Sequence, residues 1–317
     1  MSIIMPRKQM LVQFTHPGQE HVLNKKERKT MVKEWNYGPH RRKFLKAKGQ
    51  IVNDSGLSAE QEILFWGEWE PTSWVQPILK NTGKGVLPAW IHTPFLQFDK
   101  KGRLREFKKL QIVGESSCIP RCNPSPQSTP IPQNTDPFVF AQNFYYCCCK
   151  QGTFTQLKSL EKGSIILFGS TFLSAKFGGP CFALDTVFVV SEYRNYTPGN
   201  YGNDLNGFVP NDYGQIMGFD LWKKNLNFTC YKSANYQSQV DGMYSFVPCK
   251  TLADGLKGFQ RVILTDKDLS VITNDLNSAP SYTPCDNKTL KKVWETIRDI
   301  VKYQGFEEGM NFEYVRT

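Results

Sequence analysis

Two runs of consecutive apolar residues most constrain how this chain can fold. Residues 165–168 (Ile-Ile-Leu-Phe) and 187–190 (Val-Phe-Val-Val) are apolar at every position, whereas a half-buried strand alternates apolar and polar side chains. Short, β-branched and aromatic runs of this kind are typical of strands that are buried on both faces. We therefore expect a sheet that other parts of the chain cover on both sides.

The remaining pattern predicts further strands and a few helices. Short apolar runs at 11–14, 110–113, 138–146 and 262–264 predict strands. A basic helix is expected over 25–35 and a short helix over 58–65, whereas the Gly-, Asn- and Tyr-rich residues 196–218 predict a long loop.

The clearest helix is the last one. Its apolar residues recur at helical spacing, with Asp286 or Asn287 as the N-cap and Gly305 as the stop. These apolar residues are Leu290, Val293, Trp294, Ile297, Ile300 and Val301. The expected fold is α+β and β-rich: a mixed sheet or partly open barrel, with a basic helical N-terminal part and a C-terminal amphipathic helix.

Length and proline content suggest where the chain divides. A chain of 317 residues is long enough for two domains. Residues 119–137 contain six prolines among polar residues, as expected of an exposed loop or linker. We therefore expect a His- and Trp-rich part at 1–118, a linker at 119–137 and a β-rich body with the C-terminal helix at 138–317. These parts can also pack as one domain.

The net charge of +10 is concentrated at one end of the chain. Residues 1–50 contain 12 Lys or Arg and 3 acidic residues, a net charge of +9, and the chain beyond residue 150 is neutral. All four histidines and five of the seven tryptophans lie within the first 100 residues. A localised basic and aromatic segment indicates an anionic partner, which we expect to be a nucleic acid or a nucleotide.

The nine cysteines bear on compartment and on metal binding. No apolar run is long enough to span a membrane and no signal peptide is recognisable, so we expect a cytoplasmic protein with reduced thiols and no membrane contact. Cys147, Cys148 and Cys149 fall in a predicted strand, where side chains alternate, which favours packing over metal binding. All cysteines follow residue 117, so a Cys–His pair requires contact between the two halves.

Two groups of residues are candidates for catalysis. The segment His16-Pro-Gly-Gln-Glu20-His21 ends a predicted strand and could, with His92, bind a divalent metal or perform acid–base catalysis. Its alternative is a plain surface turn. Glu68 and Glu70 share one face of a strand if Trp69 faces the core. They could bind a metal, accept the amines of a base, or form structural ion pairs with nearby arginines.

A third group could bind the ligand itself. Basic side chains would contact phosphate, and aromatic rings would stack on a base. The residues expected in these roles are Arg41, Arg42, Lys43, Trp69, Ser73, Trp74, Lys101, Arg103 and Arg105. The alternative is that these charges form an ordinary solvated surface.

Motifs of several common enzyme classes are missing from the sequence. The chain has no phosphate-binding P-loop, no dinucleotide-binding glycine fingerprint, no Gly-x-Ser-x-Gly elbow and no His-Glu-x-x-His helix. Over eight residues, Glu-Lys-Gly-Ser-Ile-Ile-Leu-Phe at 161–168 resembles the Lys-Gly-Asp-hydrophobic start of a strand in PUA-like RNA- and base-binding domains. Ser164 stands where that pattern has an acid.

Three functions are compatible with these features. The first is binding or processing of a phosphate-bearing ligand, either a nucleic acid or a nucleotide, including one with a modified base. The second is a metal-dependent or acid–base nuclease or nucleotide hydrolase that uses the His/Glu group. The third is a non-enzymatic protein that docks an acidic partner. The sequence leaves the cofactor and the oligomeric state open.

Overall fold

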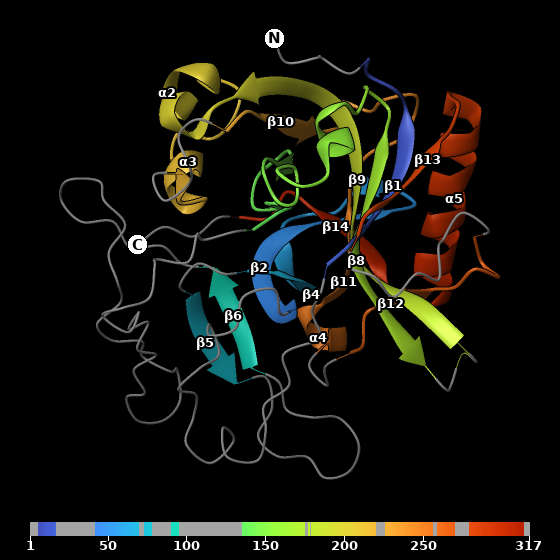
Figure 1. Cartoon of the computed structure of the whole chain (residues 1–317). Coiled ribbons are helices and arrows are strands. Elements are labelled where there is room, and N and C mark those ends of the chain that lie inside the picture. The colour runs from blue at the N-terminus through green and yellow to red at the C-terminus, as the bar shows by residue number, and fades with distance from the viewer. Residues whose placement is uncertain are drawn as a thin grey trace.

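The computed structural model describes residues 6–16, 42–69, 73–77, 90–94, 135–174, 177, 179–219, 226–255, 259–269 and 279–313. Strands dominate these residues and form two mixed sheets, accompanied by one long helix and several short helical turns (Figure 1). The fold is therefore β-rich α+β, the class that the sequence predicts. Among the helices described, none is long and apolar enough to cross a membrane.

The first sheet has the strand order β13-β1-β8-β9-β10-β7, and β12 pairs with β9. β1 runs parallel to β8, and the other neighbours are antiparallel. The bounds are β1 Met10–Thr15, β7 Tyr145–Tyr146, β8 Ile165–Ser174, β9 Gly179–Tyr196, β10 Phe228–Ser233, β12 Val262–Leu264 and β13 Ser281–Pro284.

The two apolar runs lie side by side in the middle of this sheet. Ile165 pairs with Val189 and Leu167 with Val187, and every residue of 165–168 and 187–190 is at most 1% exposed. Full burial of such a side chain contributes about 1.5–3 kcal/mol. The prediction of strands buried on both faces is therefore confirmed.

The second sheet has the order β14-β11-β4-β2-β6-β5, and β3 pairs with β2. Because β14 also pairs with β2, the strands β2, β4, β11 and β14 close into a four-stranded barrel, where the sequence suggested a partly open one. The bounds are β2 Arg42–Asn53, β3 Gly56–Leu57, β4 Gln61–Glu68, β5 Ser73–Pro77, β6 Trp90–Pro94, β11 Val247–Thr251 and β14 Glu307–Met310.

The short helix expected over 58–65 is wrong, since β4 occupies most of this stretch. Ile63, Leu64 and Phe65 are consecutive and all fully buried. A strand in a closed barrel covered on its outer side buries both faces, whereas a surface helix turns some of three consecutive residues toward solvent. The predicted helix over 25–35 and the predicted strand over 110–113 lie outside the described residues.

Both sheets combine strands from the two ends of the chain. β1 pairs with β8 and β13, and β4 and β2 pair with β11 and β14. One apolar core extends from Met10 to Phe312 through both sheets. Of the expected linker at 119–137, only 135–137 are described, and Thr135 and Asp136 are buried there.

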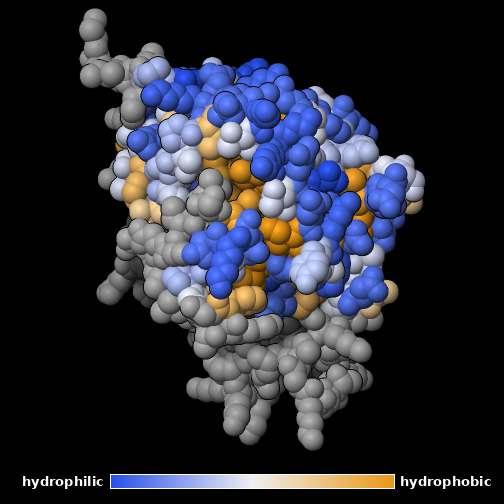
Figure 2. Space-filling view, turned by 90° about the vertical axis from the view of Figure 1, so that its right-hand side faces the viewer, coloured by the Kyte–Doolittle hydropathy of each residue, from blue (hydrophilic) through white to orange (hydrophobic). Residues whose placement is uncertain are grey.

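The C-terminal helix α5, Asn287–Tyr303, forms as predicted. The Asp286 side chain accepts a hydrogen bond of 2.7 Å from the Thr289 amide, and Gly305 follows with the positive φ of 76° that favours glycine. α5 lies beside β13 at one side of the molecule (Figure 1). Seen from that side, hydrophilic residues cover much of the surface with hydrophobic ones between them (Figure 2).

The long loop expected over 196–218 instead contains short helical turns: η2 Pro198–Asn200, α2 Tyr201–Asp204 and α3 Tyr213–Ile216. Buried apolar side chains, among them Leu205, Phe208 and Tyr213, anchor this segment to the core, which composition alone did not indicate. Two further turns are η1 Thr155–Lys158 and α4 Leu252–Gly255.

Candidate functional site

His16 lies immediately after β1, in the interior between the two sheets. Its amide donates a 2.7 Å hydrogen bond to the Gly169 carbonyl of β8, so the parallel pairing of β1 with β8 fixes its position. The His16 side chain is 1% exposed. The sequence placed His16 in a turn at the end of a strand, and the structure adds that this end of the strand is buried.

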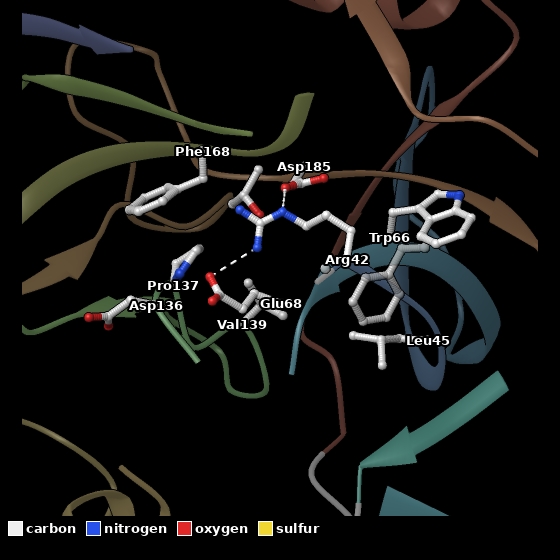
Figure 3. A pocket seen from close by; sticks show the side chains of 12 residues that line it. Arg42, Leu45, Trp66, Glu68, Asp136, Pro137, Val139, Phe168 and Asp185 are labelled. Carbon is white, nitrogen blue, oxygen red and sulfur yellow. Dashed lines mark hydrogen bonds and ion pairs between the residues drawn. The ribbon is translucent and has the colours of Figure 1, made fainter. Parts of the chain in front are cut away.

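Arg42 and Glu68 lie side by side on the neighbouring strands β2 and β4. Arg42 begins β2 and is the register partner of Glu68, the last residue of β4. Arg42 Nη1 donates to Glu68 Oε2 at 2.9 Å, and its Nε forms an ion pair with Asp185 of β9. Arg261 Nη1 donates to the other Asp185 oxygen at 3.1 Å. Two guanidinium groups and two carboxylates thus form one buried, charge-balanced network. Figure 3 draws three of its members, Arg42, Glu68 and Asp185.

The carboxylates determine the ionisation of Arg42. Burial by itself lowers the pKa of a guanidinium, but the negative charges of Asp185 and Glu68 outweigh this and raise the pKa of Arg42 above its ordinary value. Arg42 therefore stays charged in the interior, where it forms ion pairs with Glu68 and Asp185.

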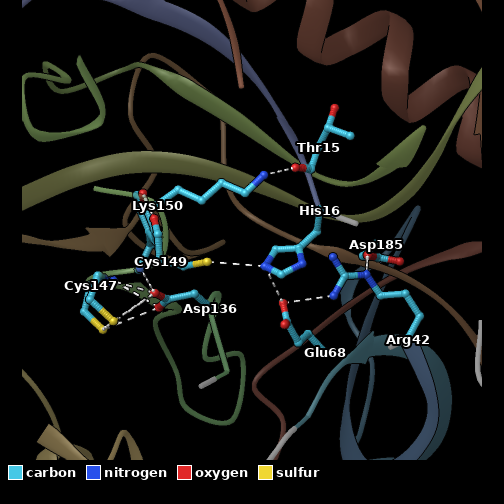
Figure 4. Close-up of polar contacts among 11 residues, drawn as sticks. Thr15, His16, Arg42, Glu68, Asp136, Cys147, Cys149, Lys150 and Asp185 are labelled. Atoms are coloured by element: carbon cyan, nitrogen blue, oxygen red, sulfur yellow. Dashed lines mark hydrogen bonds and ion pairs between the residues drawn. The ribbon is translucent and has the colours of Figure 1, made fainter. Parts of the chain in front are cut away.

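Cys149 brings a thiol to this network from a separate part of the chain. Its Sγ lies 3.3 Å from His16 Nε2, and Glu68 Oε2 lies 3.4 Å from the same nitrogen. The thiol and the carboxylate therefore both approach the same nitrogen atom of the imidazole (Figure 4). A proton leaving the thiol can be held on His16 Nε2 beside a negative charge, which is how a cysteine nucleophile is activated.

Lys150 ties the Cys149 turn to the end of β1. It adopts a φ of 61°, in the left-handed region that non-glycine residues seldom occupy and that often marks functional sites. Its Nζ donates to the Thr15 carbonyl and lies 5.2 Å from the centre of the Phe14 ring. Burial lowers the pKa of this ammonium group. Lys150, which directly follows Cys149, is thus hydrogen-bonded to Thr15, which directly precedes His16.

Asp136 shapes the turn that carries the three cysteines. Its carboxylate accepts hydrogen bonds from the amides of Cys147, Cys148 and Cys149, at 3.1, 3.0 and 2.7 Å. Burial raises the pKa of Asp136, although these three amides act in the opposite direction. The cysteines follow β7 rather than lying in a strand, so the expected alternation is wrong: the Sγ atoms of Cys147 and Cys148 are 3.3 Å apart.

A small pocket adjoins the network and combines charged and aromatic walls. Arg42, Glu68, Asp136 and Asp185 supply its polar groups, and Trp66 with Phe168 supplies aromatic surface. Figure 3 shows these side chains around one space, with Arg42 held between the two carboxylates. The space between them is about large enough for one water molecule.

Comparison with protein-family models, with curated proteins and with solved structures finds no match for this chain.

The structure brings together three of the residues predicted as functional, namely His16, Arg42 and Glu68. Trp69, expected to bind ligand, is instead fully buried and packs edge-on against Phe140 at 4.7 Å, so its ring belongs to the core. Among the described residues, the His/Glu group does not bring three possible metal ligands close together. The group whose ligand atoms all lie within 4.8 Å of one another consists of Asp136, Cys147 and Cys148.

The side chains of the other predicted residues lie outside the part of the chain that the structure describes. Lys43, Ser73, Trp74 and His92 have their backbones in β2, β5 and β6. The remaining ones lie outside the described residues: Glu20, His21, Arg41, Glu70, Lys101, Arg103 and Arg105.

Sequence reasoning missed Cys149, Asp185 and Arg261 as members of the site. One signal was available for Asp185, because it is an isolated acid within the apolar residues 182–190 of a strand expected to be buried. Cys149 carried a weaker signal, since a Cys–His pair was considered only as a contact between the halves. His16 and Cys149 are 133 residues apart. They meet because the Cys149 turn is bonded to the end of β1 through Lys150 and Thr15.

Proposed function

We propose that this chain is a thiol-dependent hydrolase that acts on a nucleotide or a nucleic acid. Cys149 is the nucleophile, His16 is its base, and Glu68 stabilises the protonated imidazole. The observation that carries this proposal is the convergence of Cys149 Sγ, at 3.3 Å, and Glu68 Oε2, at 3.4 Å, on His16 Nε2. Lys150 and Arg42 hold the thiol and the carboxylate in place.

The reaction displaces an amine from an electrophilic carbon. The Cys149 proton moves to His16 Nε2 while sulfur bonds to a base carbon that carries an exocyclic amine. His16 then gives this proton to the departing amine, which leaves as ammonia. Water, deprotonated by His16, attacks the same carbon and displaces the sulfur, which regains its proton. The net change is replacement of an amine by a carbonyl at the expense of one water.

The substrate class is supported by the charge of the chain. Residues 1–50 carry a net charge of +9, as expected of a chain that contacts phosphate. Because Arg42 is paired with two carboxylates, the proposal assigns phosphate contacts to the other basic residues, Arg41, Lys43 and the segment 100–109.

The test measures ammonia and altered bases. The purified full chain is incubated with nucleoside monophosphates and with single-stranded DNA and RNA oligonucleotides, and the digested products are weighed by mass spectrometry. We expect the wild type to release ammonia, and Cys149→Ala and His16→Gln to lose activity by about 10²–10⁴-fold. Cys285→Ala, a change at a half-buried thiol elsewhere, serves as the matched control.

Two results would overturn the proposal. One is the absence of product from every substrate with correctly folded wild type. The other is activity in Cys149→Ala that equals that of the control variant.

A further inference from the structure

A second group of donor atoms lies in the same turn, on the opposite side from His16. Cys147 Sγ and Cys148 Sγ are 3.3 Å apart. Each lies 3.5 Å from an oxygen of Asp136, Cys147 from Oδ1 and Cys148 from Oδ2. All three side chains are buried. Consecutive residues of a strand cannot place two thiols in this way, so the turn held by Asp136 creates the cluster (Figure 4).

The separations between these atoms approach those of a tetrahedral metal site. With metal–sulfur bonds of about 2.3 Å and a metal–oxygen bond of about 2.1 Å, tetrahedral geometry places two sulfurs about 3.8 Å apart and sulfur and oxygen about 3.6 Å apart. Asp136 Oδ2 lies 3.8 Å from Cys147 Sγ and 3.5 Å from Cys148 Sγ. With the sulfurs 3.3 Å apart, each separation is within about half an ångström of the tetrahedral value. Small changes in side-chain torsion would therefore suffice to admit an ion.

The donor set selects the kind of ion. Two thiolates and one carboxylate favour a thiophilic divalent ion, whereas magnesium and calcium prefer oxygen ligands alone. Binding replaces the two thiol protons, which are released to solvent, by one divalent cation. Three protein ligands leave a fourth tetrahedral position for water or another donor.

We propose that Asp136, Cys147 and Cys148 form a binding site for a zinc-class divalent ion. The ion ties the turn to Asp136 and so fixes the backbone that presents Cys149 to His16. The site is separate from the proposed catalytic thiol, whose Sγ contacts His16 at 3.3 Å. It therefore stands or fails independently of the proposed function.

The experiment uses Zn²⁺ and its spectroscopic substitute Cd²⁺. Full-length protein is purified without chelator, its zinc is measured by elemental analysis, and Cd²⁺ is titrated into the metal-free protein while sulfur-to-cadmium charge transfer is followed. We expect one ion per chain, and X-ray absorption of the cadmium form should give two sulfur neighbours. Cys147→Ser and Cys148→Ser should each weaken binding at least tenfold, whereas Cys149→Ser and Cys285→Ser should bind as the wild type does.

The outcomes separate the two proposals. Cys149→Ala that binds metal but lacks hydrolysis supports both. Wild type that takes up no stoichiometric ion, or whose cadmium has one sulfur neighbour or none, overturns the metal site and leaves the proposed hydrolase untouched. Since the wild-type measurements suffice for this decision, a cysteine variant that fails to fold does not rescue the proposal.

Discussion

Replacement of Arg42 by methionine should cost more stability than any exchange of a single surface charge. Arg42 is 1% exposed and holds both Glu68 and Asp185. Removing one partner of a buried ion pair costs about 3–5 kcal/mol. The loss should not double, because Glu68 keeps His16 at 3.4 Å and Asp185 keeps Arg261 at 3.1 Å. We therefore expect a loss of about 3–5 kcal/mol in the free energy of unfolding.

Lys46→Met on the same strand is the matched control. Lys46 forms an ion pair of 2.5 Å with Glu62, whose side chain is 41% exposed. Exposed pairs contribute about 0–1 kcal/mol, although the substitution is chemically similar. Urea unfolding followed by circular dichroism measures both losses, compared at equal m-values. A loss below about 1 kcal/mol for Arg42→Met, or equal losses in the two variants, would refute the assignment of Arg42 to a stabilising buried network.

Two further predictions concern packing and helix capping. Gly169→Ala would place its Cβ 2.2 Å from the Ala183 carbonyl oxygen, whereas a Cβ at Gly152 meets nothing within 4 Å. Gly169→Ala should therefore lower the free energy of unfolding by at least about 1–3 kcal/mol, and the control Gly152→Ala should change it little. Thermal melts measure both. The hydrogen bond from Thr289 lowers the pKa of Asp286 below its ordinary value of 3.8, so the cap stabilises α5 above that pH and the effect is lost as pH falls. Asp286→Ala should therefore lower the melting temperature at pH 7, and this difference should shrink in acid; a constant difference would contradict the capping role.

The parts of the fold that were predictable are those specified by local pattern. The consecutive apolar residues 165–168 and 187–190 match strands that are buried on both faces. The apolar residues of α5 recur at helical spacing, so one face of the helix is buried and the other is exposed. β4 was mistaken for a helix because a short apolar run has no clear period, and the barrel that buries it includes β11 and β14 from the far end of the chain. Closure of the barrel is a long-range property that no window of sequence contains.

The site was predictable to the same extent. His16 was recognisable as a polar group at the end of a strand, and Glu68 as a polar group on the strand face opposite Trp69. Arg42 was named as a possible ion-pair partner of Glu68. Asp185 and Arg261, 76 residues apart, become partners only when β12 pairs with β9. The thiol of Cys149 was assigned to packing because the turn that re-orients it depends on Asp136, a residue of the expected linker.

The charge balance of the buried network also indicates that phosphate does not bind at the network itself. Arg42 and Arg261 face Glu68 and Asp185, so two positive groups meet two negative ones. A phosphate entering this network would have to displace a carboxylate that already holds a guanidinium, without gaining net charge attraction. Its binding energy must therefore come from the basic residues outside the network. Salt screens charge contacts at a surface but hardly affects buried pairs. For the proposed hydrolase, salt should therefore weaken substrate binding and leave the rate of the step at Cys149 unchanged once substrate is bound.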